Sequence, residues 1–82
     1  MKVLGTATAL ATGTTKFDNA TAVYVFNTDS SAAAITVRNA ADNADVGTIY
    51  VPAGLGVVID LALGQGLRGA ATMYGTEIAS GD

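Results

Sequence analysis

The segment at residues 20–27, ATAVYVFN, is apolar on both faces of the strand that it predicts. Successive side chains of a strand alternate between faces, so Val23 and Val25 point one way while Tyr24 and Phe26 point the other. An antiparallel sheet commonly leaves one face in water. A chain of 82 residues has little material with which to cover both. The segment therefore predicts a strand between two layers, or a strand with one face kept for another subunit.

The composition favours a subunit of an oligomer over an enzyme. Only 13% of the residues are charged, about half the usual share. The chain has no cysteine and no histidine, so disulfides, thiolate metal sites and the commonest general base are all excluded. A small domain without such supports is often stabilised by oligomerisation. We expect one domain, residues 1–82, that forms a homo-oligomer and is not an enzyme.

The charges are few and scattered. The net charge is −3, and the four basic residues are Lys2, Lys16, Arg38 and Arg68. Nucleic-acid binding relies on clustered lysines and arginines, and no run approaches the 18 apolar residues of a membrane span. We expect neither nucleic acid nor a membrane as partner. Residues 1–11 alternate as a strand does, which we favour over a signal peptide.

Short runs of Thr, Val, Ile and Tyr recur between turn residues, as in an all-β sandwich or barrel. The predicted strands are residues 2–10, 20–27, 33–39, 46–51 and 56–61, with one or two pieces between 70 and 79. Polar loops are expected at 27–31 and 40–45, and a turn at 51–54 with a positive φ at Gly54. The fold class is all-β, a small antiparallel β-sandwich of six or seven short strands.

Alternation along these strands separates a core from an outer surface. The predicted core residues are Val23, Val25, Ile35, Val37, Ile49, Val51, Val57, Ile59 and Leu61. The aromatic residues outside this set suit an interface, because a tyrosine combines a large apolar ring with a hydroxyl group. The candidate interface residues are Tyr24, Phe26, Tyr50 and Tyr74, with Arg38 as a partner for an interfacial ion pair.

Three motifs resemble chemical sites. Residues 64–69, GQGLRG, match the G-x-G-x-x-G string, but only 13 residues follow, too few for a dinucleotide-binding unit; we read a glycine-rich turn. Asp42, Asn43 and Asp45 are too few for calcium, which takes six to eight oxygens. Asp60, on an apolar strand, is expected to be exposed or paired with an arginine rather than catalytic. We predict no catalytic residue, cofactor or metal.

The segment VYVFNTDSSAAAITVRNAADNADVGTIYVPAGLGVVIDLALGQGL resembles small virion structural proteins of tailed phages that infect cyanobacteria. The elements that carry the resemblance are KVLG at residues 2–5, VYVFN at 23–27, ITV at 35–37, GTI at 47–49 and the A-G turn and strand at 53–59. The chain departs from these proteins at residues 61–68, where LALGQGLR replaces a segment rich in lysine and proline. We expect this apolar segment to contact a capsid protein or a neighbouring subunit.

The resemblance implies a virion structural protein with no enzymatic role, made in the host cytoplasm and located in the capsid or the tail. The first hypothesis is a capsid decoration or cement protein that binds the major capsid protein or other virion proteins and stabilises the head lattice. A second hypothesis is a tail-associated knob, hub or fibre-attachment protein. A third, of another class, is a small carbohydrate or host-surface binding module in which Tyr50 and Tyr74 stack on sugars.

Overall fold

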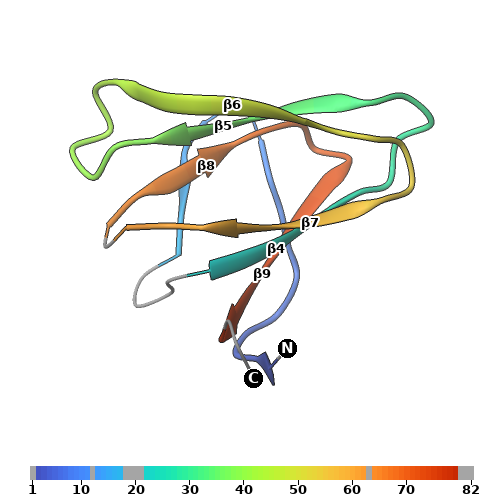
Figure 1. Cartoon of the computed structure of the whole chain (residues 1–82), viewed down its shortest axis with the longest axis horizontal. Coiled ribbons are helices and arrows are strands. Elements are labelled where there is room, and N and C mark those ends of the chain that lie inside the picture. The colour runs from blue at the N-terminus through green and yellow to red at the C-terminus, as the bar shows by residue number, and fades with distance from the viewer. Residues whose placement is uncertain (1, 12, 18–21, 63, 80–82) are drawn as a thin grey trace.

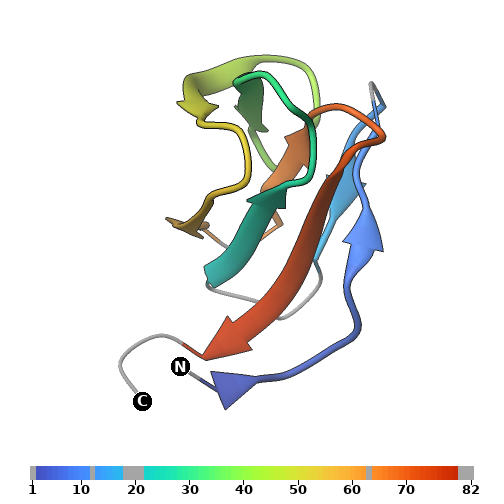
Figure 2. The same ribbon diagram turned by 90° about the vertical axis from the view of Figure 1, so that its right-hand side faces the viewer.

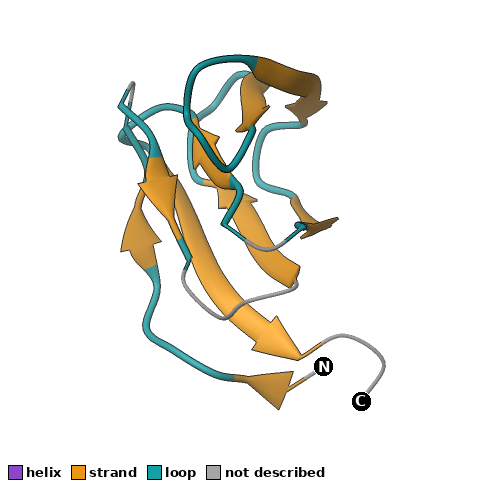
Figure 3. Ribbon diagram, turned by 90° about the vertical axis from the view of Figure 1, so that its left-hand side faces the viewer, coloured by secondary structure: helices purple, strands orange, loops and turns teal. Residues whose placement is uncertain are grey.

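The computed structural model describes residues 2–11, 13–17, 22–62 and 64–79, which form antiparallel strands and no helix (Figure 3). The first sheet contains β1 (Lys2–Val3), β2 (Thr8–Ala9), β9 (Met73–Ala79), β4 (Ala22–Asn27) and β7 (Gly56–Asp60). The second contains β3 (Thr15–Lys16), β8 (Gly66–Arg68), β5 (Ala33–Arg38) and β6 (Asp45–Val51). No helix that could cross a membrane occurs in these described ranges.

The two sheets form the two layers of a sandwich (Figures 1 and 2). The first sheet has the order β1-β9-β4-β7, with β2 also pairing with β9, and the second has the order β3-β8-β5-β6. Both edges β6 and β7 lie on one side of the sandwich, away from β1 and β2 (Figure 2). The all-β sandwich predicted from the sequence is confirmed.

The described residues form nine strands rather than the six or seven predicted, and the prediction differs from the structure in three places. Strand β3 was not predicted. Residues 2–10 form two short strands, β1 and β2, in place of one; residues 20–21 of the predicted segment 20–27 lie outside the described residues. Residues 66–68, which we read as part of a turn, form β8 inside the second sheet. Gly66 permits this, because a β-carbon there would lie 2.9 Å from the Thr15 carbonyl oxygen of the neighbouring β3.

The hydrophobic core fills the space between the sheets. Its buried members are Leu10, Phe17, Val23, Val25, Ile35, Val51, Ile59, Leu61, Leu67 and Met73. Six of the nine predicted core residues are among them, and Val37 and Val57 pack against them half-buried. Ile49 is a wrong prediction, since its side chain is 45% exposed. It shares a face with buried Ile35, but β6 is an edge strand, so the other layer does not cover it.

The apolar segment 61–68 also departs from its expected role as a contact surface. Leu61 and Leu67 are buried in the core of this chain. Alternation on β8 turns Leu67 inward beside Val37 and leaves Arg68 on the outer face beside Thr36. Leu61 and Leu67 therefore stabilise the sandwich itself.

Asn27 connects the two layers at one end of the sandwich. Its side chain is fully buried, and its Nδ2 donates hydrogen bonds of 2.9 Å to the carbonyl oxygens of Ser31 and Val51. Its Oδ1 accepts a 2.9 Å bond from the Asp29 backbone N–H. One amide thus holds the loop after β4 against the end of β6, where the chain crosses between sheets.

The turn between β6 and β7 has the predicted geometry. Gly54 adopts a φ of +70°, and its N–H donates to the Asn27 carbonyl oxygen at 2.9 Å. The Leu55 N–H donates to the Pro52 carbonyl oxygen at 3.2 Å. The proline presets φ at the start of the turn and the glycine adopts the left-handed region without strain.

Candidate functional site

The most prominent candidate site is a set of apolar side chains on the outside of the first sheet, which we call the outer apolar face: Tyr24, Phe26, Val58 and Tyr74. The antiparallel register places Phe26 of β4 opposite Tyr74 of β9, and Tyr24 opposite Val58 of β7. Directly opposite residues project to the same side, and their neighbours Val23 and Val25 are fully buried on the other side. The predicted outward orientation of Tyr24 and Phe26 is therefore confirmed.

Three members of the outer apolar face are open to solvent. Phe26 is 37% exposed, Tyr74 41% and Val58 52%. Tyr24 is half-buried because its ring lies over Gly56, where a β-carbon would come within 2.9 Å of the ring atom Cε1. The ring can lie flat against the strand because Gly56 has no side chain. The rings of Tyr24, Phe26 and Tyr74 occupy neighbouring positions on two paired strands, β4 and β9.

Little charge interrupts this face. The cross-strand row that passes through Ala22 contains Val3, Ile78 and Asp60. Ala22 and Ile78 are buried, and Asp60 is exposed at the end of edge strand β7. Exposure was one of the two environments expected for this carboxylate. Among the residues in the cross-strand rows through Ala22, Tyr24 and Phe26, Asp60 is therefore the single acidic side chain beside the outer apolar face.

The other two predicted interface residues belong to the second sheet. Tyr50 lies on edge strand β6, is 74% exposed, and stands opposite Ala34 of β5. Arg38 lies at the end of β5, with only 13% of its side chain exposed. The structure thus brings together three of the five candidate residues, and places Tyr50 and Arg38 on the opposite layer from them.

Arg38 is held by ion pairs within the chain. Its Nε lies 3.0 Å from Asp42 Oδ1 and its Nη1 lies 2.7 Å from Asp45 Oδ1. The Thr14 hydroxyl donates to the same Asp42 oxygen at 2.7 Å and accepts a 2.8 Å bond from Arg68 Nε. This polar cluster joins the β5–β6 loop to the start of β3 and to β8. Asp42 and Asp45, the two carboxylates considered as calcium ligands, therefore both form ion pairs with Arg38.

Asp42 contributes stability that depends on pH. The Thr14 hydroxyl and, next, the Arg38 guanidinium hold the pKa of the Asp42 carboxyl below its usual value. A lowered folded pKa adds stability that is fully present above the unfolded pKa, about 3.9, and is lost as the pH falls through the folded pKa. We predict that Asp42→Asn, which tolerates the φ of +56° found here, lowers the Tm at neutral pH and that this difference shrinks in acid.

Thermal unfolding followed by circular dichroism between pH 7 and pH 2 measures this effect. Asp60→Asn is the matched control, because it removes the same charge from an exposed position outside the cluster. A constant gap in Tm between wild type and Asp42→Asn at every pH would contradict the assignment of this pH dependence to Asp42.

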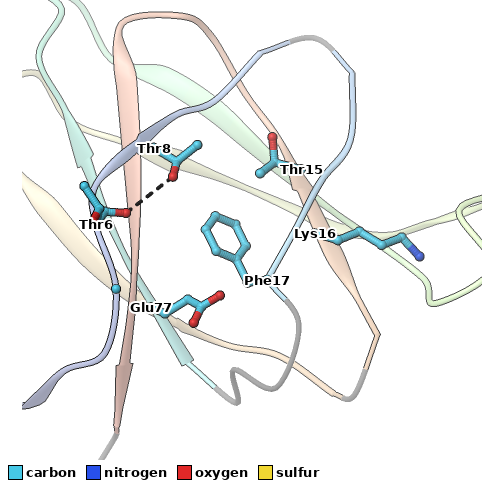
Figure 4. Close-up of a pocket in the computed structure, with 7 residues that line it drawn as sticks. Thr6, Thr8, Thr15, Lys16, Phe17 and Glu77 are labelled. Carbon is cyan, nitrogen blue, oxygen red and sulfur yellow. Dashed lines mark hydrogen bonds between the residues drawn. The ribbon is translucent and has the colours of Figure 1, made fainter.

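A cavity of about 280 Å³ opens on the side of the sandwich opposite β6 and β7. It is lined by Gly5, Thr6, Thr8, Thr15, Lys16, Phe17 and Glu77. Figure 4 shows the Glu77 carboxylate beside the Phe17 ring, with the threonine side chains around the opening. It contains one carboxylate, and Lys16 Nζ is bonded to the Ala40 carbonyl oxygen at 2.6 Å. The lining thus lacks the paired acid and base of a hydrolytic site.

Other chemistry finds little support in the described part of the chain. No group of three or more acidic side chains there could hold a metal ion. Comparison with protein-family models, with curated proteins and with solved structures found no match to this chain. Among the described residues, the outer apolar face is the surface that we take as the candidate functional site.

Proposed function

We propose that this chain is a structural subunit of a phage virion, a capsid decoration protein that stabilises the head lattice through contacts with other virion proteins. The observation that carries the proposal is the outer apolar face, on which Phe26, Tyr74 and Val58 are exposed next to Tyr24. Aromatic side chains with little charge around them are typical of the centre of protein interfaces. The resemblance to cyanophage virion proteins supplies the kind of partner.

The face suits burial against a protein better than binding of a small ligand. Its side chains come from paired strands β9, β4 and β7 and stand on the outside of the sheet. Tyr50 and Tyr74 lie on the outer faces of different sheets, so one sugar could not stack on both. We therefore retain a role in the tail as the alternative, and find no observation that favours carbohydrate binding.

Mass spectrometry of the purified virions that carry this chain tests the proposal and its alternative together. Hundreds of copies per particle, counted against the major capsid protein, are expected for a decoration protein. A handful to dozens of copies would transfer the role to the tail. Absence of the chain from purified particles would overturn the virion role altogether.

Binding of the purified chain to particles that lack it tests the outer apolar face. We predict that the double variant Phe26→Ala/Tyr74→Ala weakens binding on the order of 100-fold, since truncating two central aromatics removes two interface anchors. Phe26 and Tyr74 are 37% and 41% exposed, so their truncation also removes contacts within the chain and lowers the Tm; binding is therefore measured at a temperature where circular dichroism shows the variant folded. Thr36→Ala, on the outer face of the second sheet, is the control and should bind as wild type does. Undiminished binding by the double variant would contradict the use of this face.

A further inference from the structure

The four sheet edges in the described part of the chain differ in length and protection. On one side of the sandwich the edges are the two-residue strands β1, β2 and β3, with Lys16 on β3. On the other side, β7 has five residues and ends in Asp60, whereas β6 has seven, Asp45–Val51. Proteins usually protect an edge by shortening it or by placing charge or proline within it. In β6 such protection stands at the two ends: Asp45 and a β-bulge at Val46, where the register against β5 shifts, lie at its start, and Pro52 follows its end.

Strand β6 is also apolar and exposed on both faces. Tyr50 projects to the outer face and Ile49 to the inner one, and both are exposed, as is Val46 at the bulge. In an antiparallel pair every second residue turns its N–H and C=O away from the neighbouring strand. Since β6 pairs only with β5 among the described strands, its outward backbone groups can bind another strand.

We propose that β6 pairs antiparallel with β6 of a second copy of this chain, around a two-fold axis at Thr48. The pairing would join the second sheets into one continuous sheet with four strands from each copy. A seven-residue strand overlaps itself completely only around its middle residue, which is Thr48. Centring on Gly47 or Ile49 would pair only residues 45–49 or 47–51.

The side chains of β6 are complementary to themselves in this register. Val46, the residue at the bulge, comes opposite the partner's Tyr50 twice in this register, and an aromatic paired with a β-branched residue is favourable. Ile49 stands opposite Gly47, where a β-carbon would meet no atom within 4 Å, so the isoleucine has room. The two Asp45 carboxylates lie at opposite ends of the pair, roughly 20 Å apart at about 3.4 Å per residue, too far to repel strongly in physiological salt.

The strand that pairs with the edge of β6 is thus β6 of a second copy of this chain rather than a strand of an unrelated protein. Each exposed apolar side chain of β6 meets a matching position of the same strand, and the single charge avoids its own copy. A pair of this size is at the lower end of specific interfaces, so we expect a dissociation constant on the order of micromolar. This dimer is independent of the proposed virion role, because the outer apolar face lies on the other sheet.

Analytical ultracentrifugation of the full chain tests the pairing. Thr48→Lys places two like charges directly opposite each other at the axis, and we expect it to weaken dimerisation by at least about 10-fold. Ala34→Lys is the matched control, with the same net charge one strand away from the edge on the same face. It should dimerise as wild type does. Wild type that stays monomeric at about 100 µM, or a Thr48→Lys dimer as tight as wild type, would overturn the proposal.

Disulfide trapping tests the register. The chain has no cysteine, and the α-carbons of residues facing each other across the axis would lie about 4.5–5.5 Å apart, within the span of a disulfide. Thr48→Cys should therefore form a covalent dimer under mild oxidation. Ala34→Cys should remain monomeric. Equal crosslinking of both variants, or none of Thr48→Cys, would reject this register.

Discussion

Replacing Asn27 with aspartate should lower the free energy of unfolding by about 3 kcal/mol or more, whereas the same change at Asn39 should cost less than about 1 kcal/mol. The substitution at Asn27 removes both N–H donors and points a carboxylate oxygen at the carbonyl oxygens of Ser31 and Val51, each now 2.9 Å from Nδ2. A buried carbonyl that loses its donor keeps the full cost of its desolvation.

Asn39 is the matched control because its amide also organises a loop but is open to water. Its Nδ2 donates to Asn43 Oδ1 at 2.8 Å, and its Oδ1 accepts the N–H bonds of Asn43 and Ala44. Aspartate keeps both acceptor bonds, and water can replace the single donor bond. Both variants add the same charge, so urea unfolding at neutral pH isolates the effect of burial. Equal losses of stability would contradict the role of Asn27 as the link between layers.

A domain of this size has little stability to lose. At about 0.05–0.15 kcal/mol per residue, the whole chain is stabilised by roughly 4–12 kcal/mol. Asn27→Asp would therefore remove a quarter or more of the total. We expect the variant to unfold at a clearly lower urea concentration than wild type does.

Replacing Gly75 with valine should be about as damaging. Gly75 lies on β9 opposite Val25, and its missing side chain points into the core. A β-carbon there would lie 2.9 Å from Phe17 Cζ and 3.2 Å from Val23 Cγ1. Three added carbons cannot fit without moving both layers, and overpacking of this kind costs about 1–3 kcal/mol or more.

Gly13→Val is the control for Gly75→Val, since a β-carbon at Gly13 meets no atom within 4 Å. Denaturant unfolding should show a clear loss of stability for Gly75→Val and a small change for Gly13→Val. If Gly75→Val were as stable as the control, the inward orientation of β9 at this position would be wrong.

The sequence predicted orientation within strands better than the place of each strand in a sheet. Alternation correctly assigned Val23 and Val25 to the core and Tyr24 and Phe26 to the outside, because neighbouring side chains of a strand must point to opposite faces. It failed at Ile49, since the pattern contains no sign that β6 is an edge. It also missed β8, because the three residues Gly66–Arg68 are too short for a clear alternation and form a strand only between β3 and β5.

At the candidate site, too, the sequence predicted which way side chains point but not which residues the fold brings together. Tyr24, Phe26 and Tyr74 were predicted as outward aromatics, and pairing of β4 with β9 brings them together. No local pattern could show that Arg38 would be taken by Asp42 and Asp45, because those bonds depend on how the β5–β6 loop folds back. Buried Asn27 was read only as part of a polar loop, since its partners Ser31 and Val51 belong to separate connections.

The position of β9 also determines how slowly the first sheet can form. β1, β2 and β4 all bond to β9, so the chain between Asn27 and Met73 must fold back as one long connection before β4 and β9 can pair. Contacts between such distant residues make folding slow. The β5–β6 hairpin needs only its short loop and can form first. During refolding the apolar side chains of β4 therefore stay exposed until β9, from the far end of the chain, pairs with it. Exposed apolar strands aggregate, so we expect the recovery of native protein to fall as its concentration rises.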